Sequence, residues 1–268
     1  MTAIVAAMGP GGVVAAAPLG LLIGLILGAL GGGGGVLAVP ALVYVVGESA
    51  HDATTISLLT VGTTALVATI RNLRTGSIQL GAGLIFGLVG LGGNLLGSRL
   101  SAAVPSRVLL LAFSVLILMT AWRMHKRSTA PAVPATRAAA RQHGRWMTVV
   151  QVALAGSVVG FLAGFFGVGG GFVIVPALVM ALHYDMSVAV GTSLLVMTIN
   201  AAAGLIFRHP SSDIDWSVVI PFTVASLIGV LAGGAIADRM PAAKLTRLFV
   251  WLLVLTAGYT AARSILQG

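Results

Sequence analysis

Residues 31–43 read GGGGGVLAVPALV, and residues 167–179 read GVGGGFVIVPALV. Nine of these thirteen positions are identical, and the second stretch follows the first at an offset of 136 residues. The same offset maps Ser57 onto Ser193, Gly93 onto Gly229 and Pro105 onto Pro241. A match that keeps its register without a gap from residue 31 to residue 105 indicates that the chain contains an internal duplication.

The composition is that of a membrane protein. Of the 268 residues, 58% are hydrophobic and only 8% are charged, and the mean hydropathy is +1.07. Soluble domains carry about 25% charged residues, so a surface this poor in charge requires lipid as its solvent. The apolar segments are long and continuous, which favours helices over the alternating strands of a β-barrel. The sequence therefore predicts an all-α integral membrane protein.

Each half divides into about five apolar segments. They cover residues 13–30, 36–46, 54–70, 78–96 and 108–122 in the first half, and 147–165, 172–182, 188–207, 216–237 and 245–262 in the second. A helix over the second segment would be about 16 Å long, against a hydrocarbon core of about 30 Å. We therefore expect the first two segments of each half to form one helix, broken by glycines at membrane depth and either re-entrant or discontinuous.

A basic segment separates the halves. We predict a membrane repeat over residues 1–122, a linker over 123–145 and a second membrane repeat over 146–268; such duplication is typical of transporter folds. The linker holds six of the fifteen Lys and Arg residues, and the positive-inside bias assigns it to the cytoplasm. If each broken helix returns to its side of entry, the halves are inverted and eleven basic residues lie inside. If each broken helix crosses the membrane instead, the halves are parallel and ten basic residues lie inside. The difference of one basic residue favours inverted repeats only slightly.

The glycine runs predict a ligand site. Glycine allows a ligand to approach backbone N–H groups, and a half-helix starting near Gly35 or Gly171 directs the positive end of its dipole into the membrane interior. Two such ends facing each other would bind an anion near the midplane. Close helix packing is the alternative, and it is the role expected for Gly20, Gly24 and Gly28.

A helix face with hydroxyl groups follows the first glycine run. Ser57, Thr60 and Thr64 share one face of a helix. Their equivalents in the second half are Ser193, Val196 and Asn200. Neutral donors suit an oxyanion that must bind and then leave, whereas the alternative is hydrogen bonding between helices. Pro40 and Pro176, inside the short segments, are either hinges beside the site or fixed kinks.

Three further polar residues are candidates for a vestibule. Arg71 and Arg208 end equivalent segments, where they would attract anions or only extend to the lipid headgroups. Asn94, alone between glycines, is the third. The sequence contains no cysteine, no catalytic cluster and no Lys-Ser/Thr phosphate loop, so we expect neither an enzyme nor a bound cofactor or metal. A basic domain with interleaved aromatics is also missing, which argues against nucleic-acid binding.

The two Val-Pro-Ala-Leu motifs, at 39–42 and 175–178, follow glycine runs, and Gly-Thr-Ser-Leu-Leu occupies 191–195. In duplicated halves, this pattern resembles the TauE/SafE sulfite exporter family over nearly the whole chain. The motif residues carried over by position are Gly31, Gly33, Gly34, Gly35, Pro40, Gly167, Gly169, Gly170, Gly171, Pro176, Thr192 and Ser193. The first half departs from the pattern, because Thr55 stands where the second half has Gly191.

The resemblance implies a multi-pass permease of a bacterial-type inner (plasma) membrane. We expect a secondary transporter of sulfite, organosulfonates or a related small sulfur-containing anion, with a proton or a sodium ion as the candidate coupling ion. A passive anion channel and a membrane scaffold without transport are the alternatives. The sequence leaves open the exact substrate, the direction of transport and the oligomeric state.

Overall fold

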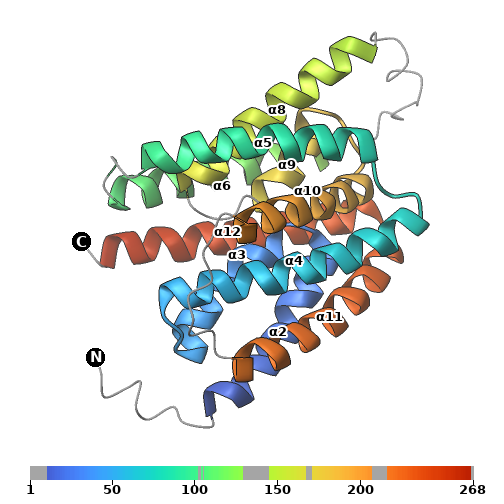
Figure 1. The fold of residues 1–268 in the computed structure, drawn as a ribbon. Helices are drawn as coiled ribbons and strands as arrows, with labels where there is room; N and C mark the ends of the chain where they lie inside the picture. Colours follow the sequence, from blue (N-terminus) through green and yellow to red (C-terminus); the bar gives the residue numbers. More distant parts are fainter. Residues whose placement is uncertain are drawn as a thin grey trace.

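The computed structural model is a bundle of helices (Figure 1). It describes residues 11–101, 104, 106–128, 145–166, 171–206 and 216–266, and these contain no strand. The helices are α2 (Gly11–Leu30), α3 (Gly33–Ala41), the π-helical turn η1 (Leu42–Val46), α4 (Ala50–Arg74), α5 (Leu80–Ser101), α6 (Ser106–Ser128), α8 (Arg145–Phe166), α9 (Gly171–Met180), α10 (Met186–Ile206), α11 (Trp216–Asp238) and α12 (Ala242–Leu266). Each predicted apolar segment corresponds to a helix.

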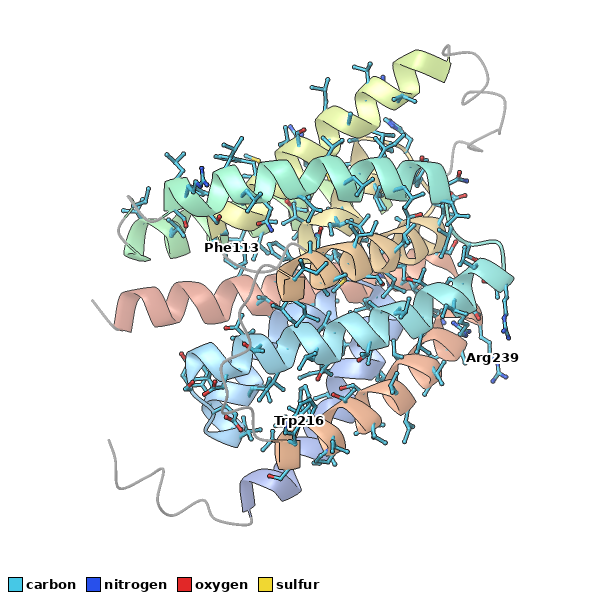
Figure 2. The ribbon with its side chains drawn as sticks, viewed as in Figure 1. Phe113, Trp216 and Arg239 are labelled. Carbon is cyan, nitrogen blue, oxygen red and sulfur yellow. The ribbon has the colours of Figure 1, made fainter. Side chains whose placement is uncertain are left out.

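The outer surface of the bundle is apolar. Five of the described helices, α4, α5, α8, α10 and α11, are long and apolar enough to cross a membrane. Large side chains such as Leu96 and Leu255 are 65% and 66% exposed, and side chains project outward around the bundle in Figure 2. A soluble protein does not present an apolar surface of this extent to water. The predicted all-α membrane class is therefore confirmed.

A glycine break separates α2 from α3. Gly31 adopts a left-handed conformation with φ +70°, which glycine reaches without steric cost. The short helix then begins at Gly33, two residues before the predicted Gly35, and η1 follows directly after Pro40-Ala41. Pro40 removes one N–H donor from the helical ladder, and a π-helical turn accommodates such a disruption. The first half thus has the helix break that its sequence predicts.

In the second half, α9 begins at Gly171, as predicted, and ends at Met180. The glycines predicted to break this helix, Gly167, Gly169 and Gly170, lie outside the described residues. Phe172 in α9 contacts Phe113 of α6 with ring centroids 5.0 Å apart, and Phe113 also contacts Phe166 at the end of α8. These aromatic contacts join α6 to the short helix and to the end of α8; Phe113 is labelled in Figure 2.

Helices α4 and α10 lie side by side through the middle of the bundle and run antiparallel (Figure 1). Gly62 of α4 faces Ala201 of α10, and Gly204 faces Leu58. They are also the most buried of the five helices that are long enough to span a membrane. The offset of 136 maps α4 onto α10, so two sequence-equivalent helices cross the centre in opposite directions.

Around this centre, α2 packs against α11, α5 against α8, and α6 against α12. Each of these pairs takes one helix from each half. The offset maps α2 onto α8 and α5 onto α11, so the α2–α11 and α5–α8 pairs are equivalent. The two halves of the chain therefore interlock in space and do not lie apart as two separate bundles.

Glycines make the α2–α11 contact close. A Cβ atom on Gly20, Gly24 or Gly28 would overlap the carbonyl oxygens of Phe222, Ser226 and Val230 respectively. The Ser226 hydroxyl donates a hydrogen bond of 2.9 Å to the carbonyl of Gly20. Small residues that allow backbones to approach are typical of helix pairs in membranes, so these three glycines have the packing role predicted for them.

Candidate functional site

The starts of the two short helices meet inside the bundle. A Cβ atom on Gly32, which precedes α3, would overlap the carbonyl oxygen of Gly171, the first residue of α9. No side chain caps the N-terminus of α3, so its first N–H groups have no partner of that kind. We refer to Gly31, Gly32, Gly35 and Gly171 as the glycine junction. Two helix N-termini, each favourable to negative charge, lie together there.

Met197 of α10 covers the glycine junction. Its Cε atom lies 3.0 Å from a Cβ position on Gly35 and 2.9 Å from one on Gly171, and the side chain is 5% exposed. Val61 Cγ1 of α4 lies 3.7 Å from the same Cβ position on Gly35. Met197 was not predicted from the sequence, although its spacing from Ser193 and Asn200, i+4 and i−3, places it on the same helix face.

The predicted hydroxyl of Ser193 lies against the junction. Its Oγ is 2.6 Å from a Cβ position on Gly31, and it donates to the carbonyl of Val190 at 2.8 Å. The adjacent Thr192 has a different role. Its Oγ1 accepts a hydrogen bond of 3.2 Å from the backbone N–H of Gln79, just before α5 begins, so it fixes the position of that helix.

The hydroxyls of α4 are buried. Thr60 Oγ1 shares a hydrogen bond of 2.8 Å with Thr223 Oγ1 of α11, and Thr64 Oγ1 donates to the carbonyl of Thr60 at 2.6 Å. For Thr60, the structure thus has the interhelical bond that was the alternative to ligand binding. Ser57 is also buried, with 7% of its surface exposed.

Among the predicted site residues that the structure describes, Asn200 has a buried polar atom without a hydrogen-bond partner. Its Oδ1 atom is buried and has no hydrogen-bond partner in the structure. Buried polar atoms without partners are uncommon in folded proteins, and a bound molecule can supply the missing partner. A 180° rotation of the amide would bring Nδ2, a donor, to the same position.

A cavity of about 480 Å³ adjoins the glycine junction. It lies between the ends of α4, α10, α11 and α12, and its lining residues are Gly28, Arg71, Asn72, Thr75, Ser77, Ser187, Val190, Gly234, Ala237, Asp238, Met240, Ala242 and Leu245. Val190 connects it to the junction, because its Cα lies 3.3 Å from a Cβ position on Gly31 and its carbonyl accepts from Ser193.

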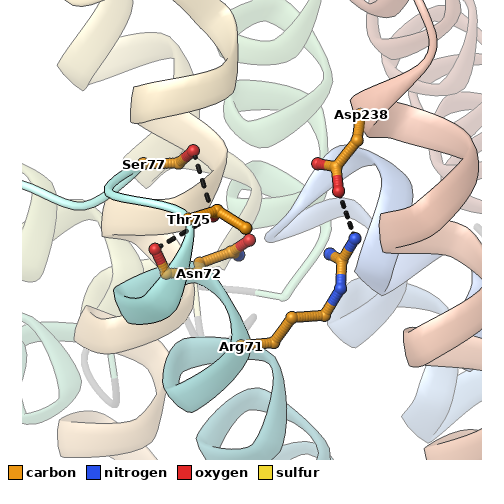
Figure 3. Close-up of polar contacts among 5 residues, drawn as sticks. All are labelled: Arg71, Asn72, Thr75, Ser77 and Asp238. Carbon is orange, nitrogen blue, oxygen red and sulfur yellow. Dashed lines mark hydrogen bonds and ion pairs between the residues drawn. The ribbon is translucent and has the colours of Figure 1, made fainter.

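Arg71, predicted for a vestibule, lines this cavity and forms an ion pair with Asp238 of α11 (Figure 3). Nearby, the Thr75 hydroxyl donates to the carbonyl of Asn72 at 3.1 Å and lies 3.3 Å from the Ser77 hydroxyl. Asp238 was not predicted from the sequence. It is one of only six acidic residues in the chain, and that scarcity was the signal that could have identified it.

The other predicted residues lie elsewhere. Gly34 packs on α2, where its Cβ position is 2.6 Å from the carbonyl oxygen of Ile23, and Pro176 is buried in α9. Asn94 faces Gly164 in the α5–α8 contact, with Oδ1 2.5 Å from a Cβ position on that glycine. Gly33 is the first residue of α3. Arg208 lies outside the described residues.

The family model described as "Sulfite exporter TauE/SafE" matches residues 16–260. The chain belongs to the TauE/SafE family. A probable membrane transporter protein of Xylella fastidiosa (strain 9a5c) is 36% identical to it over 260 residues, covering 91% of this chain and 93% of the relative. The probable membrane transporter protein YunE of Bacillus subtilis (strain 168) is 28% identical over 255 residues, with 88% and 93% covered.

The resemblance drawn from the glycine and Val-Pro-Ala-Leu motifs is thus confirmed, and this TauE/SafE protein is a multi-pass membrane transporter. No solved structure shows a significant match to the chain. The structure brings together the glycine junction, Ser193 and the cavity beside Arg71, and these are the residues from which a transport site can be built.

Proposed function

We propose that this TauE/SafE protein is a secondary transporter that carries sulfite, an organosulfonate or a related small sulfur-containing anion past the glycine junction. The observation that carries the proposal is the contact between the N-terminal ends of α3 and α9 at Gly32 and Gly171. The first N–H groups of α3, which no side chain caps, and two positive dipole ends favour an anion at this position.

Neutral donors complete the proposed site. The amide of Asn200 supplies one if it is rotated so that Nδ2 takes the position of the unsatisfied Oδ1. The Ser193 hydroxyl beside Gly31 supplies another if it turns from the Val190 carbonyl to the anion. Ser57 and Thr64 lie on the neighbouring central helix and are further candidates. A fixed cation at the midplane would hold an anion too tightly for release, whereas hydroxyl, amide and backbone donors bind it with less energy. Met197 must move aside for the anion to pass, and an unbranched thioether has the rotational freedom to do so.

We further propose that the halves, residues 1–122 and 146–268, are inverted repeats that exchange conformations during transport. Support comes from the antiparallel course of the equivalent helices α4 and α10 and from the equivalent α2–α11 and α5–α8 pairs. The cavity beside Arg71 then belongs to the cytoplasmic side. α4 and α11 end on this side, Arg239 lies there, and α8, which follows the basic linker 123–145, begins there (Figures 1 and 2).

Countertransport in sealed proteoliposomes tests this function. Vesicles preloaded with sulfite are diluted into labelled sulfite, with taurine, sulfoacetate, thiosulfate and sulfate as competitors. We expect saturable uptake that is accelerated by internal substrate and blocked by at least one competitor. Uptake that is linear in concentration would indicate a channel instead, and no uptake of any of these anions by folded protein would overturn the proposal. Imposed proton and sodium gradients identify the coupling ion.

Asn200→Ala is expected to raise the KM for the exchanged anion roughly tenfold or more. The loss of a hydrogen bond to a charged group costs about 1.5–3 kcal/mol, and a factor of ten corresponds to about 1.4 kcal/mol. Initial exchange rates over a range of sulfite concentrations measure the change. Asn94→Ala is the matched control, because Asn94 packs between α5 and α8 and its removal should leave the KM unchanged. An equal increase in the KM of both variants would show that Asn200 does not bind the anion.

A further inference from the structure

The cavity beside the glycine junction contains one pair of opposite charges among its described lining residues. Arg71 comes from the last turn of α4 and Asp238 from the end of α11, and the two side chains are paired across the space between these helices (Figure 3). The other polar groups of the lining are neutral amides and hydroxyls, such as Asn72 and Ser187. Any anion that enters the cavity meets a single guanidinium there, and Asp238 occupies it.

The Arg71 guanidinium packs against α11 at Gly234, where the absence of a side chain leaves room for it. A Cβ atom on Gly234 would overlap Nη1 of Arg71 and would lie 3.0 Å from its Cζ. Gly229 and Gly233 of α11 have glycine equivalents in the first half, Gly93 and Gly97, because both α11 and α5 use them for helix packing. The equivalent of Gly234 is Ser98. Gly234 therefore differs from the repeated glycines, because its own Cβ position faces the Arg71 side chain and not helix backbone.

Asp238 follows Gly234 by four residues, so the glycine that packs against Arg71 and the carboxylate that pairs with it share one face of α11. The two charged side chains differ in their access to water: 49% of the Asp238 side chain is exposed, against 24% of the Arg71 side chain. Asp238 can therefore leave the ion pair for water, and return to it, at little cost in desolvation. The less exposed Arg71 is more costly to leave without an anionic partner.

We propose that Arg71 is the entry site for the transported anion and that Asp238 is a tethered competitor that occupies it until substrate arrives. The inference rests on the proposed function, since it takes the substrate to be a small oxyanion. A sulfite or sulfonate group presents two oxygens to a guanidinium in the same bidentate manner as a carboxylate. Substrate and Asp238 therefore exchange one for the other, and Arg71 keeps an anionic partner throughout.

The ion pair has no position-by-position equivalent in the sequence of the other half. At the offset of 136, Arg71 and Asp238 correspond to Phe207 and Ala102, and Arg208 is one position beyond Phe207. Because the pair links α4 to α11, substrate binding to Arg71 also releases this link at the end of the cavity. Entry from this side is thus selective for anions.

Opposite effects of two substitutions test the proposal. In sulfite exchange by proteoliposomes, Asp238→Asn removes the competitor and is expected to lower the KM by roughly threefold, the scale of a partly exposed ion pair. Arg71→Gln removes the entry site and is expected to raise the KM at least about tenfold. Gly234→Ala retains both charges but displaces the guanidinium, so it should resemble Arg71→Gln.

Arg74→Gln is the matched control, because it removes the same charge from the same turn of α4 at a residue outside the cavity lining. Thermal stability in detergent shows that each variant is folded. If the ion pair only ties two helices together, Asp238→Asn and Arg71→Gln will change the KM in the same direction or not at all, and the inference is overturned while wild-type exchange still supports the proposed function. Absence of exchange in the wild type would instead overturn the proposed function and this inference with it.

Discussion

A Gly35→Val variant is expected to lose saturable anion exchange while it remains folded. Gly35 lies in the first turn of α3, where its Cβ position meets the mobile end of Met197 at 3.0 Å and the methyl groups of Val61 at 3.7 Å and 4.0 Å. The thioether can yield to added atoms, but two γ-methyl groups would cover the N–H groups that we assign to the anion. Loss of one charge-assisted hydrogen bond or more, at about 1.5–3 kcal/mol each, predicts a reduction of roughly a hundredfold in the rate at low substrate concentration.

The neighbouring glycine provides the contrast. A Cβ atom on Gly34 lies 2.6 Å from the carbonyl oxygen of Ile23 and 2.7 Å from the backbone nitrogen of Leu27. Gly34→Val should therefore separate α3 from α2 and reduce the yield of folded protein. Size-exclusion profiles and thermal midpoints in detergent distinguish the two variants before exchange is measured. Wild-type exchange by a folded Gly35→Val protein would move the transport site away from the glycine junction.

Gly24→Val is expected to have the largest effect on stability. A Cβ atom on Gly24 overlaps the carbonyl oxygen of Ser226 and approaches its Cα to 2.7 Å, so backbone atoms, which cannot rotate away, must separate. Overpacking of a well-packed interior costs about 1–3 kcal/mol and occasionally more, and we expect about 3 kcal/mol or more here. The free energy of unfolding, measured by denaturant titration in mixed micelles, gives the value directly.

Gly92→Val on α5 is the matched control for this prediction. No atom lies within 4 Å of its Cβ position, and the residue is exposed on the apolar outer surface. The same glycine-to-valine change at Gly92 should lower the free energy of unfolding by much less than Gly24→Val does. Similar losses in the two variants would show that helix propensity, and not the α2–α11 contact, sets the cost.

Local features of the fold could be predicted from the sequence, because they depend on short stretches of chain. The glycine run predicts the break at Gly31, and the length of the apolar segment that follows predicts a helix too short to span the membrane. The spacing of Gly20, Gly24 and Gly28 predicts a packing face. It does not identify the partner, because α11 lies some two hundred residues further along the chain and a small-residue face fits any close helix.

The candidate site was predicted less completely, for a similar reason. Gly31 and Ser193 belong to the sequence motifs, so the sequence identifies both as candidate site residues. Met197 could not, since a methionine in an apolar helix has no distinguishing pattern. The partner of Arg71 is 167 residues away in the chain, and nothing local to either residue indicates the pairing. Thr192 belongs to the same motif as Ser193, but its hydrogen bond to Gln79 serves the start of α5.

The interlocked halves have a consequence for biosynthesis. Helix α2 is the first described helix to leave the ribosome, and its glycine face is matched by α11, the second-to-last. During translation the glycine face of α2 must therefore remain in contact with lipid, or with a transient neighbouring helix, until α11 has been inserted as far as residue 238. Helix α5, by contrast, receives α8 much earlier. The order of synthesis thus lets the α5–α8 pair form before the α2–α11 pair, which must wait for α11.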